Sequence, residues 1–163
     1  MRAAILTVSS SRAAGGRPDE SGPALALFAE SVGAEVAASE IVPDKQSEIE
    51  WALRHYSDTE ECDLVLTTGG TGFAPDDVTP EATRAVIERE APGIAEALRA
   101  ASRQHTRNWM LSRGVAGIRG RSLIINFPGS PKSIGEAGEA IGEAIPHAVA
   151  VLRDGAGRRH DGH

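Results

Sequence analysis

The chain has 163 residues, of which 40% are hydrophobic and 25% are charged, and its formal net charge is −6. This length suits one domain with one substantial core, and the composition excludes a fibrous or disordered chain. The net negative charge disfavours nucleic-acid binding, because non-specific duplex binding needs clustered Lys and Arg. An acidic protein that handles phosphates must concentrate its positive groups locally or use a divalent metal.

Three features of the sequence indicate a cytoplasmic protein without a membrane partner. Cys62 is the only cysteine, which excludes an internal disulfide, fits a reducing compartment and is expected in the core. No apolar run reaches the ~18 residues that a membrane span needs. The segment from Met1 to Val8 is too short for the apolar region of a signal peptide.

Strands and helices are predicted to alternate along the first half of the chain. The apolar run from Ala3 to Val8 predicts a strand buried on both faces, and a helix is expected from Pro23 to Val32. A second strand is predicted from Glu35 to Val42 and a helix from Gln46 to Tyr56. The third strand is predicted from Asp63 to Thr68.

The second half continues this pattern. Helices are expected to start at Thr79 and at Pro92, and a further strand is predicted from Arg121 to Phe127. The last helix carries a wide apolar stripe from Ile134 to Leu152, and Pro146 is expected to kink it.

The alternation of strands and helices predicts a fold class. Right-handed crossovers between parallel strands place helices on both faces of the sheet. We therefore expect a single α/β domain of three layers (α/β/α) with a mainly parallel sheet over residues 1–153, and a polar C-terminal tail over residues 154–163. Ligands of such folds bind outside the carboxyl ends of the strands.

A glycine-rich turn follows the third strand. Gly69, Gly70 and Gly72 surround Thr71, and glycine lets backbone N–H groups approach an anion closely while a threonine hydroxyl adds a donor. The turn lacks both the Gly-Lys-Ser/Thr ending of a Walker A loop and the G-x-G-x-x-G pattern of dinucleotide sites. It indicates either an anion site or a tight turn that needs glycine only for its shape.

Carboxylates follow this turn and the second strand. Asp76 and Asp77 precede Thr79, which is expected to cap a helix, and Asp44 follows the second strand. Such carboxylates can hold Mg²⁺ together with substrate phosphates. The alternatives are a helix dipole that favours one of the two adjacent aspartates, and a Pro-Asp turn at Asp44.

Small and basic side chains follow the last predicted strand. Ser130, Lys132 and Ser133 lie at the start of the last helix, where free N–H groups and the dipole favour an anion. Helix capping alone would also explain the two serines.

The other chemically distinctive side chains offer no competing site. His55, His105 and His147 lack a metal-ligand spacing, and Trp51 and Trp109 are expected to pack rather than to stack on a ligand. No serine lies in a nucleophile-elbow pattern, so covalent acyl chemistry is disfavoured.

Three motifs in a fixed order carry a resemblance to a known family. They are Thr67-Thr68-Gly69-Gly70-Thr71-Gly72, then Asp77-Val78-Thr79-Pro80-Glu81, then Asn126-Phe127-Pro128-Gly129-Ser130-Pro131-Lys132-Ser133. Together they resemble the molybdopterin adenylyltransferase family, the Mog/MoaB-like domain of molybdenum-cofactor biosynthesis, over residues 1–152.

The resemblance implies an activity and a set of site residues. The activity is Mg²⁺-dependent transfer of AMP from ATP to the terminal phosphate of molybdopterin, with release of pyrophosphate, by a homotrimer whose partner protein is a molybdate insertase. The resemblance implies that Asp44 and Asp77 are catalytic and bind the metal. The substrate-binding residues that it implies are Ser10, Asp19, Ser21, Gly69, Gly70, Thr71, Gly72, Thr79, Gly129, Ser130, Lys132 and Ser133.

One departure from the family leaves a second function open. Ser11 stands where many active members have an aspartate. The alternative to the enzyme is a noncatalytic pterin-binding or assembly protein of the same fold, without ATP turnover. Asp44 and Asp77 favour the enzyme, because a pterin binder has less need of metal-binding acids.

Overall fold

A computed structural model describes residues 1–158 and contains one six-stranded sheet in the order β2-β1-β3-β6-β5-β4. Four of its strands are parallel, namely β1 (Arg2–Val8), β2 (Glu35–Val42), β3 (Leu64–Thr68) and β6 (Ser122–Phe127). The predicted mainly parallel sheet is thus confirmed. Two strands that the sequence analysis did not predict, β4 (Arg89–Glu90) and β5 (Ala116–Arg119), add an antiparallel edge beyond β6.

The position of each strand explains its sequence. All residues of β3 and β6 are buried, as are residues 3–8 of β1, which is why these strands read as continuous apolar runs. The strand β2 lies at the edge of the sheet, and its exposure alternates from residue to residue. This explains its weaker apolar pattern.

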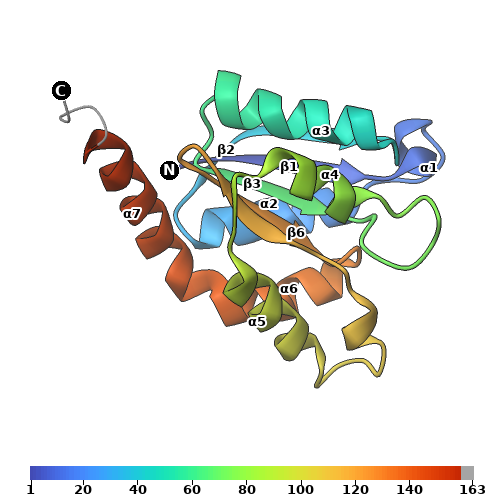
Figure 1. Ribbon diagram of the computed structural model, residues 1–163. Helices are drawn as coiled ribbons and strands as arrows, with labels where there is room; N and C mark the ends of the chain where they lie inside the picture. The colour runs from blue at the N-terminus through green and yellow to red at the C-terminus, as the bar shows by residue number, and fades with distance from the viewer. Residues whose placement is uncertain (159–163) are drawn as a thin grey trace.

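Helices cover both faces of the sheet (Figure 1). One face carries α3 (Gln46–Arg54) and α4 (Thr79–Val86), and the other carries α2 (Ser21–Ser31), α5 (Pro92–Ser102) and α6 (Pro131–Ile141). Successive strand residues supply the two cores, because they point to opposite faces. Ile5 packs in the core beneath α2, α5 and α6, whereas Leu6 packs in the core beneath α3 and α4.

The C-terminal helical region differs from its prediction. The expected single kinked helix was wrong, because α6 is followed by a 3₁₀ turn, η3 (Gly142–Ala144), and then by α7 (Ile145–Arg158). Pro146 lies in the first turn of α7, where its missing N–H donor costs no helical hydrogen bond. Residues 154–158, expected as part of a polar tail, belong to α7, and residues 159–163 lie outside the described part of the chain.

Two further predictions concern single side chains. Cys62 is free and fully buried, as expected. Trp51 was expected to pack, and its ring stacks on His55 at 4.8 Å between ring centroids, but this contact lies at the surface, since Trp51 is 62% exposed. His55 begins a π-helical segment, η1 (His55–Thr59), that continues from α3.

The sheet topology defines where a ligand site is expected. The strand β1 lies between β2 and β3. After β1 the chain crosses to β2 on one side of it, and after β2 the chain crosses back to β3 on the other side of β1. In parallel sheets the crevice at such a reversal of strand order is the usual ligand site. In residues 1–158, no helix has the length and apolar character to cross a membrane.

Candidate active site

The carboxyl ends of β1 and β3 meet at the glycine turn. Gly69 and Gly70 have positive φ angles of 91° and 68°. A Cβ atom added to Gly69 would lie 2.5 Å from the carbonyl oxygen of Val8, at the end of β1. Glycine at these positions is therefore needed for the shape of the turn and for the close approach of the two strand ends.

Thr79 holds this turn from α4. Its Oγ1 donates a hydrogen bond to the carbonyl oxygen of Gly69 (3.0 Å), and its N–H donates to the carbonyl oxygen of Gly70 (3.1 Å). Its predicted capping role was wrong, because Val78 occupies the N-cap position and Thr79 is the first residue of α4. Thr79 is fully buried, so its structural task is to fix the turn.

Asp44 faces the glycine turn from the end of β2. Its Oδ2 accepts a hydrogen bond from the N–H of Ser10 (2.8 Å), and its own N–H donates to the Oγ of Ser10 (2.9 Å). A Cβ atom added to Gly70 would lie 3.4 Å from Oδ1 of Asp44. Ser10 begins the short helix α1 (Ser10–Ala13), which lies between β1 and α2 and which the sequence analysis did not predict.

Asp77 lies beside the other end of the turn. Its Oδ2 accepts a hydrogen bond from the N–H of Ala74 (3.0 Å) and would lie 2.8 Å from a Cβ atom added to Gly72. Asp44 and Asp77 therefore approach the same turn, whereas Asp76 is exposed in the loop.

The carboxylates of Asp44 and Asp77 suit a single cation whose remaining ligands come from a substrate. In residues 1–158, no group of three or more His, Cys, Asp or Glu side chains is placed to hold a metal ion. Mg²⁺ takes oxygen ligands and is commonly held by one or two carboxylates together with substrate phosphates. Asp44 and Asp77 fit that mode of binding.

Asp19 and Ser21 connect the start of α2 to the site. Both oxygens of Asp19 are engaged: Oδ2 accepts from the hydroxyl of Thr7 (2.7 Å), and Oδ1 accepts from the N–H groups of Ser21 and Gly22. The buried hydroxyl of Ser21 donates to the carbonyl oxygen of Gly129 (2.7 Å). These two residues thus orient the loops around the site.

The segment from Pro128 to Ser133 borders the glycine turn. A Cβ atom added to Gly129 would lie 3.7 Å from the Cα of Gly69. Ser130 is exposed and caps α6, since its Oγ accepts from the N–H of Ser133 (3.2 Å). The Lys132 side chain is 84% exposed, and its Nζ lies 3.8 Å from a carboxylate oxygen of Glu136.

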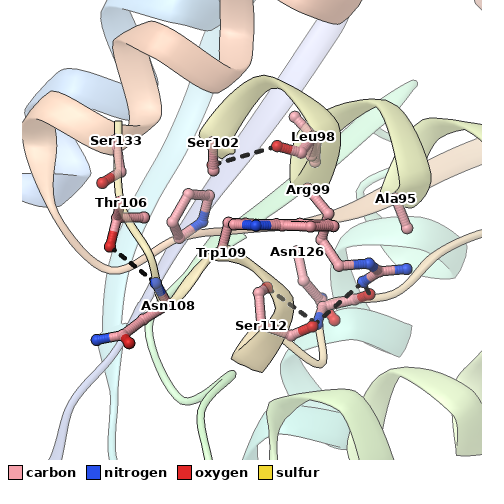
Figure 2. A pocket seen from close by; sticks show the side chains of 12 residues that line it. Ala95, Leu98, Arg99, Ser102, Thr106, Asn108, Trp109, Ser112, Asn126 and Ser133 are labelled. Carbon is pink, nitrogen blue, oxygen red and sulfur yellow. Dashed lines mark hydrogen bonds between the residues drawn. The ribbon is translucent and has the colours of Figure 1, made fainter. Parts of the chain in front are cut away.

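Figure 2 shows a cavity of about 120 Å³ beside this segment. Trp109, on the 3₁₀ turn η2 (Trp109–Leu111), lines it, and so does Arg99 from α5. The buried Asn126 of β6 also lines the cavity and donates to the hydroxyls of Thr67 (3.0 Å) and Thr83 (2.9 Å). The remaining lining residues are Ala95, Leu98, Ser102, Thr106, Asn108, Ser112, Gly114, Pro128 and Ser133.

Residues of this region were missed or underrated by sequence reasoning. The segment over residues 103–115 has no regular apolar period, so nothing in it predicted that Trp109 lines a cavity or that Arg113 contacts the acidic loop. Its length between two elements was the one available signal, because long connections often carry function.

The sequence and structure match proteins of one family. The model of the family described as "Probable molybdopterin binding domain" matches residues 4–147. The "Molybdenum cofactor synthesis protein cinnamon" of Drosophila melanogaster is 42% identical over 151 residues, which are 92% of this chain and 25% of that protein. A "Molybdopterin adenylyltransferase" of Helicobacter pylori is 50% identical over 113 residues, which are 69% of this chain and 64% of that protein.

A solved structure agrees with these matches. The crystal structure of the "Molybdopterin biosynthesis enzyme MoaB" from Thermus thermophilus superimposes with a TM-score of 0.87 at 48% sequence identity. The match covers 93% of this chain and 95% of that one. The chain therefore spans nearly all of the MoaB structure but a quarter and about two thirds of the two relatives named above.

Proposed function

We propose a nucleotidyltransferase function for this chain, which belongs to the family of probable molybdopterin binding domains. The reaction is the transfer of AMP from ATP to molybdopterin. An oxygen of the terminal phosphate of molybdopterin attacks the α-phosphorus of ATP, the bond from that phosphorus to the bridging oxygen breaks, and pyrophosphate leaves. The name of the Helicobacter pylori relative supports this activity.

One observation carries the proposal: Asp44 lies beside Gly70 and Asp77 lies beside Gly72 of one glycine turn, at the reversal of strand order. Phosphoryl-type transfer needs little covalent chemistry from the protein, because positioning and charge neutralisation supply most of the rate. Two carboxylates that can bind a cation, beside glycines whose backbone a phosphate can approach closely, suit this need for positioning and charge neutralisation. No nucleophilic side chain is needed, since the substrate phosphate attacks.

Asp44 and Asp77 would hold Mg²⁺ together with the phosphates of ATP. The ion would neutralise negative charge on the transferring and leaving phosphates. Ser10 would orient Asp44, and Ala74 would orient Asp77, through the hydrogen bonds described above.

We assign the remaining substrate contacts to two regions. The N–H groups of the glycine turn, with the Thr71 hydroxyl, would contact phosphate oxygens, and Ser130, Ser133 and Lys132 would add donors and positive charge. The pterin ring would occupy the cavity at Trp109, where an aromatic face and the Asn126 amide meet. Asp19, Ser21, Thr79 and Gly129 would act through the loops that they hold.

The assembly and setting of the reaction are further parts of the proposal. A homotrimer and a molybdate insertase as recipient of the product come from the family resemblance. A cytoplasmic setting is supported by the single free cysteine.

Pyrophosphate release from ATP and Mg²⁺, with and without molybdopterin, tests this function. We expect release that depends on molybdopterin and that is lost in Asp77→Asn. Asp76→Asn is the matched control, because this neighbouring aspartate is exposed and should leave the release unchanged. Tight pterin binding without pyrophosphate release would favour the noncatalytic pterin-binding protein instead.

A further inference from the structure

The loop from Gly72 to Asp77, here called the acidic loop, is held from outside by one side chain. Arg113 donates from Nε to the carbonyl oxygen of Gly72 (2.8 Å) and from Nη2 to the carbonyl oxygen of Asp77 (2.6 Å). One guanidinium group thus joins the first and last residues of the loop. In the part of the chain that the structure describes, no other residue outside the loop hydrogen-bonds to it.

Arg113 is itself fixed from several directions. Its N–H donates to the carbonyl oxygen of Thr71 (2.8 Å), and its Nη1 forms an ion pair with Glu81 at the start of α4. The hydrogen bond from Arg113 lowers the pKa of Glu81 and so favours the charged form of this carboxylate. Arg99 holds the adjacent backbone by donating to the carbonyl oxygen of Gly114 (2.8 Å).

The choice of acceptor on Asp77 is informative. The guanidinium bonds to the main-chain carbonyl of Asp77, while the carboxylate of this residue receives the N–H of Ala74. A carboxylate has about four acceptor positions. The carboxylate therefore keeps acceptor positions for a cation, although an arginine fixes the backbone from which it projects.

We propose that Arg113 is a positioning residue that sets the place of the Asp77 carboxylate by holding both ends of the acidic loop. The role needs the fork of a guanidinium group, because a lysine ammonium has its donors on one atom and cannot span two carbonyl groups in the same fixed geometry. The part of this role that concerns catalysis rests on the proposed function. Misplacement of a catalytic group by about 1 Å can cost roughly 100-fold in rate.

The first test measures the loop and is independent of any activity. The N–H groups of Ala74 and Asp77 are hydrogen-bonded inside the acidic loop, to Oδ2 of Asp77 and to the carbonyl oxygen of Ala74. We expect hydrogen exchange at these two amides to accelerate roughly tenfold in Arg113→Ala and in Arg113→Lys, as for the loss of one hydrogen bond to a charged group. Arg119→Ala is the matched control, since Arg119 pairs with Asp58 and the carbonyl oxygen of Val86.

The second test measures the Mg²⁺ concentration that gives half-maximal AMP transfer. We expect it to rise roughly tenfold in Arg113→Lys, since the Asp77 carboxylate loses its fixed place, and to stay at the wild-type value in Arg119→Ala. Should Arg113→Ala fail to fold, Arg113→Lys decides the question in both tests. Unchanged exchange at Ala74 and Asp77 in a folded Arg113 variant would overturn the positioning role. Absence of AMP transfer by the wild-type protein would instead overturn the proposed function and leave the exchange result valid.

Discussion

Ser10 and Asp44 hold each other through two reciprocal hydrogen bonds, in which each main-chain N–H donates to the side-chain oxygen of the other residue. The pair joins the start of α1 to the end of β2. It fixes the Asp44 carboxylate without using a positive charge, so the negative charge of this group stays available to a cation.

Because of these hydrogen bonds, the charge of Asp44 can be removed while its structural role is kept. Asp44→Asn keeps a side-chain oxygen that can accept from the N–H of Ser10, but it removes the negative charge. We expect AMP transfer to fall by about 100-fold or more, the scale seen when one electrostatic group is removed from an active site. The urea midpoint should stay within the error of the wild-type value.

Ser10→Ala is the companion to that variant. It removes the hydroxyl that accepts from the N–H of Asp44 but leaves the charge of the carboxylate. The rate should fall less than in Asp44→Asn. Equal rates of AMP transfer in Asp44→Asn and the wild type would contradict the assigned role.

The glycine at position 69 should be required for stability. Gly69→Ala introduces a Cβ atom 2.5 Å from the carbonyl oxygen of Val8 at a φ angle of +91°. We expect a loss of more than about 2 kcal/mol in the free energy of unfolding, since backbone strain and a steric clash add. Gly120→Ala is the control, because that glycine has a φ angle of +56° but open space around it, and it should cost about 1 kcal/mol. If urea unfolding gave similar losses of free energy for Gly69→Ala and Gly120→Ala, the close approach of Gly69 to Val8 would not be the cause of the destabilisation.

An ion pair that joins α7 to the sheet predicts that the free energy of unfolding depends on pH. Asp63 is buried and accepts from Arg153 (2.9 and 2.7 Å) and from the N–H of Arg2 (2.7 Å). Burial raises the pKa of this carboxyl group, but the hydrogen bonds from Arg153 and Arg2 outweigh that effect and lower the pKa below its ordinary value. The charged form is therefore favoured more in the folded state than in the unfolded state.

The sign of the pH effect follows from that lowered pKa. The stabilisation is complete above the ordinary aspartate pKa of about 3.9 and is lost as the pH falls through the lower value of the folded state. Asp63→Asn should cost about 2 kcal/mol at pH 7. The difference from the wild type in urea unfolding should shrink below about pH 4. A difference that stays constant down to pH 2.5 would contradict this explanation.

The cavity at Trp109 gives an optical test of where the pterin binds. Trp51 is exposed, and Trp51 and Trp109 are the only tryptophans, so Trp51→Phe leaves Trp109 as the single reporter. We expect molybdopterin to quench the fluorescence of this variant at saturation, because the ring would contact the indole. Pterin-dependent pyrophosphate release without any change in Trp109 emission would place the pterin elsewhere.

The fold was largely predictable because its strands are buried in a parallel sheet. Such strands read as continuous apolar runs, and three of the four parallel strands have that character. The antiparallel edge was not predictable, since β4 has two residues, both exposed, and β5 is only half buried. Pro146 was misread because proline can either kink a helix or begin one, and only the packing of the two helices decides between these roles.

The candidate site was predictable where chemistry follows a strand end. The glycine turn directly follows β3, Asp44 comes just after β2, and Asp77 lies in the loop between β3 and α4; the sheet brings them together. Arg113 and Trp109 come from a segment without a regular apolar period, and Arg113 contacts Asp77 and Gly72, which lie 36 and 41 positions away in the sequence. A local sequence pattern does not reveal contacts between residues that are so far apart in the chain.

Transfer of labelled AMP tests the central claim most directly. The protein is incubated with molybdopterin, Mg²⁺ and ATP that carries a label on its α-phosphate, and the pterin product is separated from the nucleotide. We expect the label to appear on molybdopterin in equal amount to the pyrophosphate released, and to form about 100-fold more slowly, or slower still, with Asp44→Asn and Asp77→Asn. Molybdopterin that binds to the folded protein but acquires no label would contradict the nucleotidyltransferase function.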